Sequence, residues 1–337
     1  MPTIDLPIAL GGLIVGFLVG MTGVGGGALM TPMLVLIFGI EPLTAVSSDL
    51  VAAVIMKPIG GGVHLRRGTV KLDLVKWLMV GSLPCAFLGV MLLKLAGTGP
   101  ELQMRIKLGL GYALLVASAC ILLRPLLTKR HQGGDTHVPV RVIPTILVGA
   151  LGGLIVGMTS VGSGSLMIVL LFLLYPRFRL SDLVGTDLVQ AIPLVFSAAL
   201  GHVLMGDFKL ALTGSILVGA VPGVYLGARL SSRAPDGILR PILVVALASS
   251  SLKLLGASNH LLALSAGAIA LVAFGMSLPE LRRNLARARD KAKQTEQQRD
   301  QDESTGSRAQ PASPHPALTV DPAAQTTEEA RRLRAVK

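Results

Sequence analysis

VGMTGVGGGALM, at residues 19–30, returns further along the chain as VGMTSVGSGSLM, at residues 156–167. Nine of the twelve positions are identical, and the other three exchange one small residue for another. Clustered glycines lower helix propensity, so each stretch predicts a break inside an apolar helical segment. Two copies of an apolar unit, each with a glycine-broken segment, are typical of secondary transporters.

The similarity between the two copies continues downstream of the glycines, offset by one extra residue. The matched pairs are Ser48-Asp49-Leu50-Val51 with Thr186-Asp187-Leu188-Val189, His64 with His202, Gly68 with Gly206, Lys71 with Lys209, Pro84 with Pro222, and Leu88-Gly89 with Leu226-Gly227. Because these pairs keep their order, the whole unit is duplicated rather than one motif.

The composition is that of a membrane protein. Hydrophobic residues make up 51% of the 337 residues, and the mean hydropathy is +0.66. A net charge of +12 would suggest nucleic acid in a soluble chain. Here the basic residues lie mainly in loops and in the tail, so we expect contact with the lipid bilayer and no nucleic-acid partner. Cys85 and Cys120 lie inside apolar segments and are expected to be small core residues.

The lengths of the apolar segments predict an all-α polytopic fold. Residues 7–38 would form a helix about 48 Å long, against about 30 Å of hydrocarbon, so a broken or re-entrant hairpin is expected. Residues 142–175 repeat this segment. Simple spans are expected near residues 43–63, 72–96, 102–124, 182–204, 210–230, 236–255 and 260–279.

The basic residues of the loops favour hairpins that enter and leave on one side. With the N-terminus outside, this topology places most loop Arg and Lys residues in the cytoplasm, as the positive-inside rule requires. Those residues are Arg66, Arg67, Lys71, Arg124, Lys129, Arg130, Arg141, Arg177, Arg179, Arg229, Arg233 and Arg240. Counting each broken segment as one full crossing would place Arg177 and Arg229 opposite Arg66.

The hairpin topology makes the two copies inverted repeats, because each copy has a hairpin plus three crossings and three is odd. We expect a first repeat, a cytoplasmic linker, a second repeat, a final transmembrane helix and a charged, largely disordered cytoplasmic tail. Their ranges are 7–124, 125–141, 142–255, 256–279 and 280–337. The protein is expected to cross a membrane several times, with its C-terminus in the cytoplasm. No basic segment precedes the first apolar run, so we expect mature membrane structure there rather than a signal peptide.

These motifs, in this order and present twice, resemble the TauE/SafE family, the sulfite exporter or sulfonate permease family of bacterial membranes. The resemblance covers about residues 8–279. It implies a secondary transporter of small anions, sulfite or organosulfonates, that works by alternating access and mostly outward. Transport of another small organic or inorganic anion stays open, as does a homodimer. The resemblance implies no enzyme activity.

The two broken segments are the expected binding site for an anion. A helix that restarts at the membrane midplane offers free N–H groups and the positive end of its dipole, and glycines allow close approach and positive φ. The expected substrate-binding residues here are Gly25, Gly26, Gly27, Gly162, Ser163, Gly164 and Ser165. The alternative is that these small residues only allow tight helix packing.

Three ionisable residues lie deep inside apolar runs. Lys57 precedes Pro58 and is the best candidate for the positive charge that binds the anion, since buried charges in membranes are usually functional. Alternatively, it extends toward Arg66 and the interface or pairs with a structural acid. Asp49 and Asp187 occupy matched positions and are candidates for proton coupling or for helix caps. The second copy has Val195 where Lys57 would fall.

Other functions find weaker support in the sequence. His64 and His202 fall near helix ends and are expected at the membrane interface. Ser163, Ser165 and His202 loosely resemble an intramembrane serine protease, but the first copy has Gly26 and Ala28 at the serine positions. A non-transporting membrane assembly protein is a further alternative, but it would not explain why inverted repeats contain broken helices. No cluster of metal ligands and no cofactor motif is recognised.

Overall fold

The computed structural model describes residues 4–22, 25–66, 70–97, 99–128, 139–178, 180–205, 207–230 and 236–275. The chain divides into two units, Met1–Asn284 and Leu285–Lys337, of which only the first contains described residues. The expected tail, residues 280–337, therefore lies outside the described residues, as does most of the expected linker.

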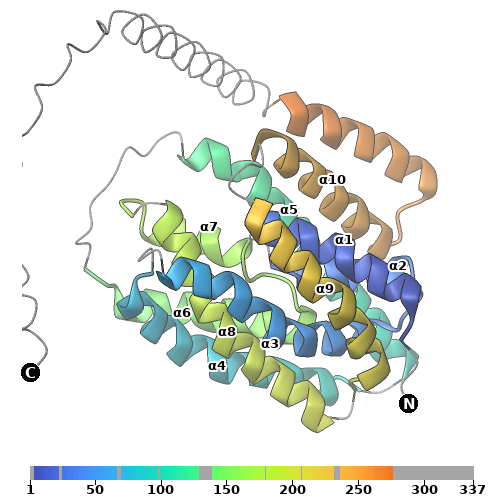
Figure 1. The fold of residues 1–337 in the computed structure, drawn as a ribbon, viewed down its shortest axis with the longest axis horizontal. Helices are drawn as coiled ribbons and strands as arrows, with labels where there is room; N and C mark the ends of the chain where they lie inside the picture. The colour runs from blue at the N-terminus through green and yellow to red at the C-terminus, as the bar shows by residue number, and fades with distance from the viewer. Residues whose placement is uncertain are drawn as a thin grey trace, which may run out of the picture. The chain divides into compact units, whose positions relative to one another are not determined.

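The described part is helical (Figure 1). The helices are α1 (Leu6–Thr22), α2 (Gly27–Leu36), α3 (Pro42–Arg66), α4 (Leu72–Leu95), α5 (Pro100–Thr128), α6 (Val142–Thr159), α7 (Leu166–Leu174), α8 (Leu180–Met205), α9 (Leu210–Leu230), α10 (Asp236–Leu254) and a last helix, Asn259–Gly275. Six of them, α3, α4, α5, α6, α8 and α9, contain apolar stretches long enough to cross a membrane. The expected all-α membrane fold is confirmed at this level.

Both glycine-rich stretches interrupt a helix, as the sequence predicts. The first break, residues 23–26, separates α1 from α2, and the second break, residues 160–165, separates α6 from α7. The two breaks differ in backbone conformation. Gly162 and Gly164 have φ values of +126° and +93°, whereas Gly26 is right-handed helical at φ −52°. The positive φ expected at Gly25, Gly26 and Gly27 is therefore wrong, since none of these three glycines has it.

Helices of the two sequence copies pack against each other in equivalent pairs. The most extensive contacts join α1 to α9 and α4 to α6, and α3 lies against α8 (Figure 1). If α1 corresponds to α6 and α4 to α9, the first two pairs are the same pair of elements with the copies exchanged. The helix packing therefore follows the duplication in the sequence.

Glycines spaced four residues apart bring α1 close to α9. A Cβ atom added to any of these glycines would meet backbone atoms of the other helix: Gly12, Gly16 and Gly20 on α1, and Gly219, Gly223 and Gly227 on α9. The same spacing recurs where Gly149, Gly153 and Gly157 of α6 meet α4. Small residues at such spacing are the usual means of close packing between membrane helices.

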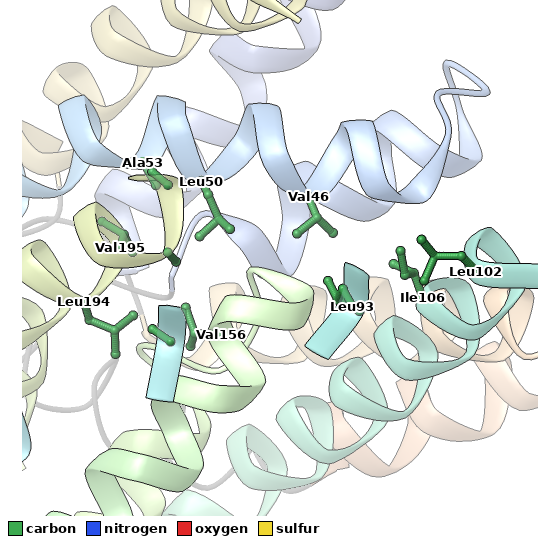
Figure 2. Packing of buried hydrophobic residues seen from close by; sticks show 12 residues of the cluster. Val46, Leu50, Ala53, Leu93, Leu102, Ile106, Val156, Leu194 and Val195 are labelled. Carbon is green, nitrogen blue, oxygen red and sulfur yellow. The ribbon is translucent and has the colours of Figure 1, made fainter. Parts of the chain in front are cut away.

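The helices α3 and α8 run antiparallel through the centre of the fold. Ser47, near the start of α3, contacts His202, near the end of α8. Further along α3, Leu50 and Ala53 belong to one buried cluster with Leu194 and Val195 of α8 (Figure 2). This arrangement places the interiors of both helices beside the second break.

Candidate functional site

The two breaks lie in direct contact. A Cβ atom added to Gly25 would clash with the carbonyl oxygen of Ser163, and one added to Gly27 would clash with that of Ser160. Gly26 differs, since its added Cβ would meet only the end of the Met56 side chain, at 3.8 Å. Close packing is thus one role of Gly25 and Gly27, and it brings the starts of α2 and α7 together.

Asp49 is fully buried next to this contact. Its Oδ2 accepts hydrogen bonds from the Thr31 hydroxyl of α2, at 2.9 Å, and from the Ser160 hydroxyl of the second break, at 2.7 Å. The carboxylate thus joins α2, α3 and the second break. It lies two turns inside α3, which begins at Pro42.

Asp187 is also fully buried and lies two turns inside α8. Its Oδ2 accepts a hydrogen bond of 2.7 Å from the backbone N–H of Gly164. Gly164 directly precedes Ser165, the N-cap residue of α7. Asp187 therefore places a carboxylate at the positive end of α7 rather than at the start of its own helix.

Lys57 extends from α3 toward the second break. Its ammonium group donates a hydrogen bond of 2.5 Å to the Ser163 hydroxyl. In the described part of the chain, no ion pair within 4 Å joins it to either carboxylate. The second break thus contacts all three side chains: Lys57 through Ser163, Asp49 through Ser160 and Asp187 through Gly164.

Several buried polar atoms around the breaks have no hydrogen-bond partner within the described residues. They are Ser48 Oγ, Asp49 Oδ1, Ser165 Oγ, Asp187 Oδ1 and Gln190 Oε1. Buried polar atoms are nearly always paired, so such a group calls for a specific explanation. Two of these atoms belong to hydroxyls that can donate, as an anion requires, and three are oxygens that accept, as a proton requires.

His202 lies in the last turn of α8, near a helix end as expected, but packs inside the protein. Its side chain is fully buried, and its Nε2 donates to the carbonyl oxygen of Gly157 at 3.0 Å. Its Nδ1 lies 2.8 Å from the Ser47 hydroxyl. These contacts join α8 to α6 and α3, and neither involves Ser163 or Ser165, so the nucleophile–base contact of a serine protease is not formed. The side chain of His64 lies outside the described residues.

The sequence interpretation missed three polar residues of the site: Thr31, Ser160 and Gln190. The other copy has a small or apolar residue at each matched sequence position: Ile168 for Thr31, Gly23 for Ser160 and Ala52 for Gln190. A comparison of the two copies for such polar differences would have found them. Lys57 shows the same kind of difference, because the second copy has Val195 at the matched position.

The site carries two acids and one base. With Asp49 and Asp187 ionised and Lys57 charged, the group has a net charge of −1. The hydroxyls of Ser48 and Ser165 and the N-terminus of α7 offer donors to an anion. The arrangement can hold a small anion only if its negative charges are compensated, because like charges repel strongly away from water.

Comparison with known proteins agrees with the resemblance noted in the sequence. The family model described as Sulfite exporter TauE/SafE matches residues 8–254. The Probable membrane transporter protein YjnA of Bacillus subtilis (strain 168) is 38% identical over 255 residues, which cover 74% of this chain and 100% of that protein. The Probable membrane transporter protein YdhB of the same organism is 26% identical over 246 residues, covering 72% and 96%.

No solved structure matches the chain. The family model covers most of the apolar part, including both breaks and the residues Asp49, Lys57 and Asp187. The helices described above are long and apolar enough for a multi-pass membrane protein. The chain therefore belongs to the sulfite exporter TauE/SafE family of membrane transporters.

Proposed function

We propose that this protein is a secondary transporter that moves small anions, sulfite or organosulfonates, outward across the bacterial cell membrane by alternating access. The observation that carries the proposal is the contact between the two breaks, with Lys57 of α3 bonded to Ser163 of the second break. Broken helices that meet at the midplane, with a fixed charge beside them, are the usual construction of a substrate site in such transporters.

We propose that the two copies are inverted repeats, each with a hairpin and three crossings. The antiparallel course of α3 and α8 supports this, since equivalent helices of inverted repeats run in opposite directions. If each broken segment crossed the membrane completely, an even number of crossings would separate the copies and α3 and α8 would run parallel. The N-terminus then lies outside, with Arg66 and Arg177 in the cytoplasm.

In this proposal the anion binds where the breaks meet. The backbone N–H groups at the starts of α2 and α7 and the hydroxyls of Ser163 and Ser165 act as donors. Lys57 supplies the positive charge, and Gly25 and Gly27 allow the breaks to approach. Alternating access requires that this contact open on one side at a time, so the closely packed breaks represent the closed centre of the cycle.

The test is a flux assay in proteoliposomes with sulfite, sulfate, taurine, sulfoacetate and methanesulfonate, each with and without a pH gradient. We expect uptake or release of at least one sulfur oxyanion above that of protein-free liposomes. Lys57→Met should reduce this flux to the protein-free rate. The absence of flux for all five compounds with correctly folded protein contradicts the proposal.

A further inference from the structure

The carboxylate of Asp187 lies where the proposed function places the substrate. It accepts the hydrogen bond of Gly164 N–H at the start of α7, which is an anion-binding position. The Asp187 carboxylate and the transported anion therefore compete for the N–H group of Gly164. A substrate that binds to the start of α7 must displace Asp187 from Gly164.

Two acceptor atoms beside this position lack a donor. Asp187 Oδ1 and Gln190 Oε1 are both buried without a hydrogen-bond partner among the described residues, and they lie three positions apart on the same face of α8. The amide nitrogen of Gln190 already donates to Ser82 Oγ at 2.7 Å. An ionised carboxylate is only an acceptor, whereas a protonated one can donate. A single proton on Asp187 would supply the missing donor.

The hydroxyls of Ser48 and Ser165 complete the set. Both are buried, at 0% and 3% exposure, and neither has a hydrogen-bond partner in the described part of the chain. A hydroxyl can donate to an anion, and Ser165 lies next to Gly164 in the chain. The unpaired atoms thus divide into donors suited to an anion and acceptors suited to a proton.

Few ionisable groups face Asp187. Lys57 and Asp49 lie on α3, which packs against α8, while α6 and α7 contain no ionisable side chain. Other charges on the helices that pack against α8 lie toward helix ends: the Lys71–Asp182 ion pair, the exposed Asp73–Lys76 pair, Lys94 bonded to the Met205 carbonyl, and the buried His202. One cation therefore faces two carboxylates, and an arriving anion adds a further negative charge.

We propose that Asp187 is the proton-binding residue of the transport cycle and that anion and proton bind together. The step is the conversion of the Asp187 carboxylate to the neutral acid by one proton from water, while Gly164 N–H transfers its hydrogen bond from Asp187 to the anion. The site then keeps the same net charge after a monovalent anion binds. This inference rests on the proposed function, and it assigns the coupling ion.

The experiment measures proton uptake when methanesulfonate binds to the purified full-length protein in weakly buffered detergent solution containing a pH indicator. Methanesulfonate keeps a single negative charge near neutral pH and has no carbonyl group. We expect about one proton taken up per anion bound. The dissociation constant should rise about tenfold per pH unit where the free carboxylate is ionised, as one-proton linkage requires.

Asp187→Asn should bind methanesulfonate without proton uptake, with an affinity that no longer depends on pH. At alkaline pH it should bind more tightly than wild type, because the competing negative charge is gone. Asp49→Asn should still take up a proton, since Asp49 accepts only side-chain hydroxyls in this site. The matched control is Asp73→Asn on the exposed first turn of α4, which should behave as wild type.

Anion binding to wild type without proton uptake overturns the proposal, and so does uptake that Asp49→Asn abolishes and Asp187→Asn retains. If Asp187→Asn fails to fold, infrared difference spectra of the wild-type protein provide a second test. Methanesulfonate should then produce the carbonyl band of a protonated carboxyl group, and the absence of that band overturns the proposal. If no anion of the flux panel binds or moves at any pH, the proposed function itself fails.

Discussion

The ammonium group of Lys57 donates a hydrogen bond of 2.5 Å to the hydroxyl of Ser163, which lies 106 residues further along the chain. This bond joins α3 of the first copy to the break of the second copy. The Lys57 side chain therefore extends toward the second break.

Lys57→Met should remove anion binding and lower the stability of the protein. Removal of the ammonium leaves the Ser163 hydroxyl without its donor and two buried carboxylates without compensation, which should cost about 1.5–3 kcal/mol. Asp187→Asn in the same chain should restore more of this loss than Asp49→Asn, because Asp187 has one hydrogen-bond donor, Gly164 N–H, whereas the hydroxyls of Thr31 and Ser160 both donate to Asp49. Thermal unfolding of the single and double variants measures this order, and unchanged anion affinity in Lys57→Met would exclude Lys57 from the site.

Alanine substitutions at Gly25, Gly26 and Gly27 should have different effects on stability. Gly25→Ala and Gly27→Ala place a Cβ against carbonyl oxygens of the second break and should destabilise the protein by about 1–3 kcal/mol, as overpacking does. Gly26→Ala is the matched control, because its backbone is helical and only the Met56 side chain lies nearby. Equal losses of melting temperature in all three variants would contradict the close contact of the breaks.

The glycine contacts between α1 and α9 allow a similar test on one helix. Gly219→Ala should lower the melting temperature, because its Cβ would meet the backbone of Ala9 and Leu13. Gly214→Ala on the same helix has no neighbouring atom within 4 Å and should be neutral, or stabilising by up to about 1 kcal/mol through helix propensity. A greater loss for Gly214→Ala than for Gly219→Ala would show that α1 and α9 do not pack in this register.

His202→Leu should destabilise the protein by about 1–3 kcal/mol, because the buried Ser47 hydroxyl and Gly157 carbonyl would each lose a partner. The control is His260→Leu, at an exposed position of the last helix, which should leave the melting temperature unchanged. If His202→Leu instead unfolds at the wild-type temperature, these two hydrogen bonds contribute nothing measurable to stability.

The proposed topology predicts where cysteines become accessible to membrane-impermeant reagents. In a background of Cys85→Ala and Cys120→Ala, a cysteine at Ile40 should react from outside the cell. A cysteine at Arg177 should react only after the membrane is permeabilised. Labelling that places positions 40 and 67 both in the cytoplasm would exclude the hairpin topology.

The sequence by itself was sufficient for the helical membrane fold, the two breaks, the positions of the helices and the family. These features depend on local properties, namely apolar length and glycine content. Both copies of the duplicated unit show the same properties. The helix bounds follow the expected spans closely: α9 covers Leu210–Leu230, and α4 ends at Leu95, one residue from the expected end.

Only the tertiary structure decided which residues meet. The pairing of Lys57 with Ser163, the place of Asp187 at the start of α7, the burial of His202 and the different roles of Gly25 and Gly26 all depend on how two distant copies pack. The sequence does not reveal this packing, because lipid and protein interior are equally apolar and a membrane helix need not mark its buried face with hydrophobic residues. Glycine spacing shows that helices approach closely, but the partner and the register are settled by contacts across the whole fold.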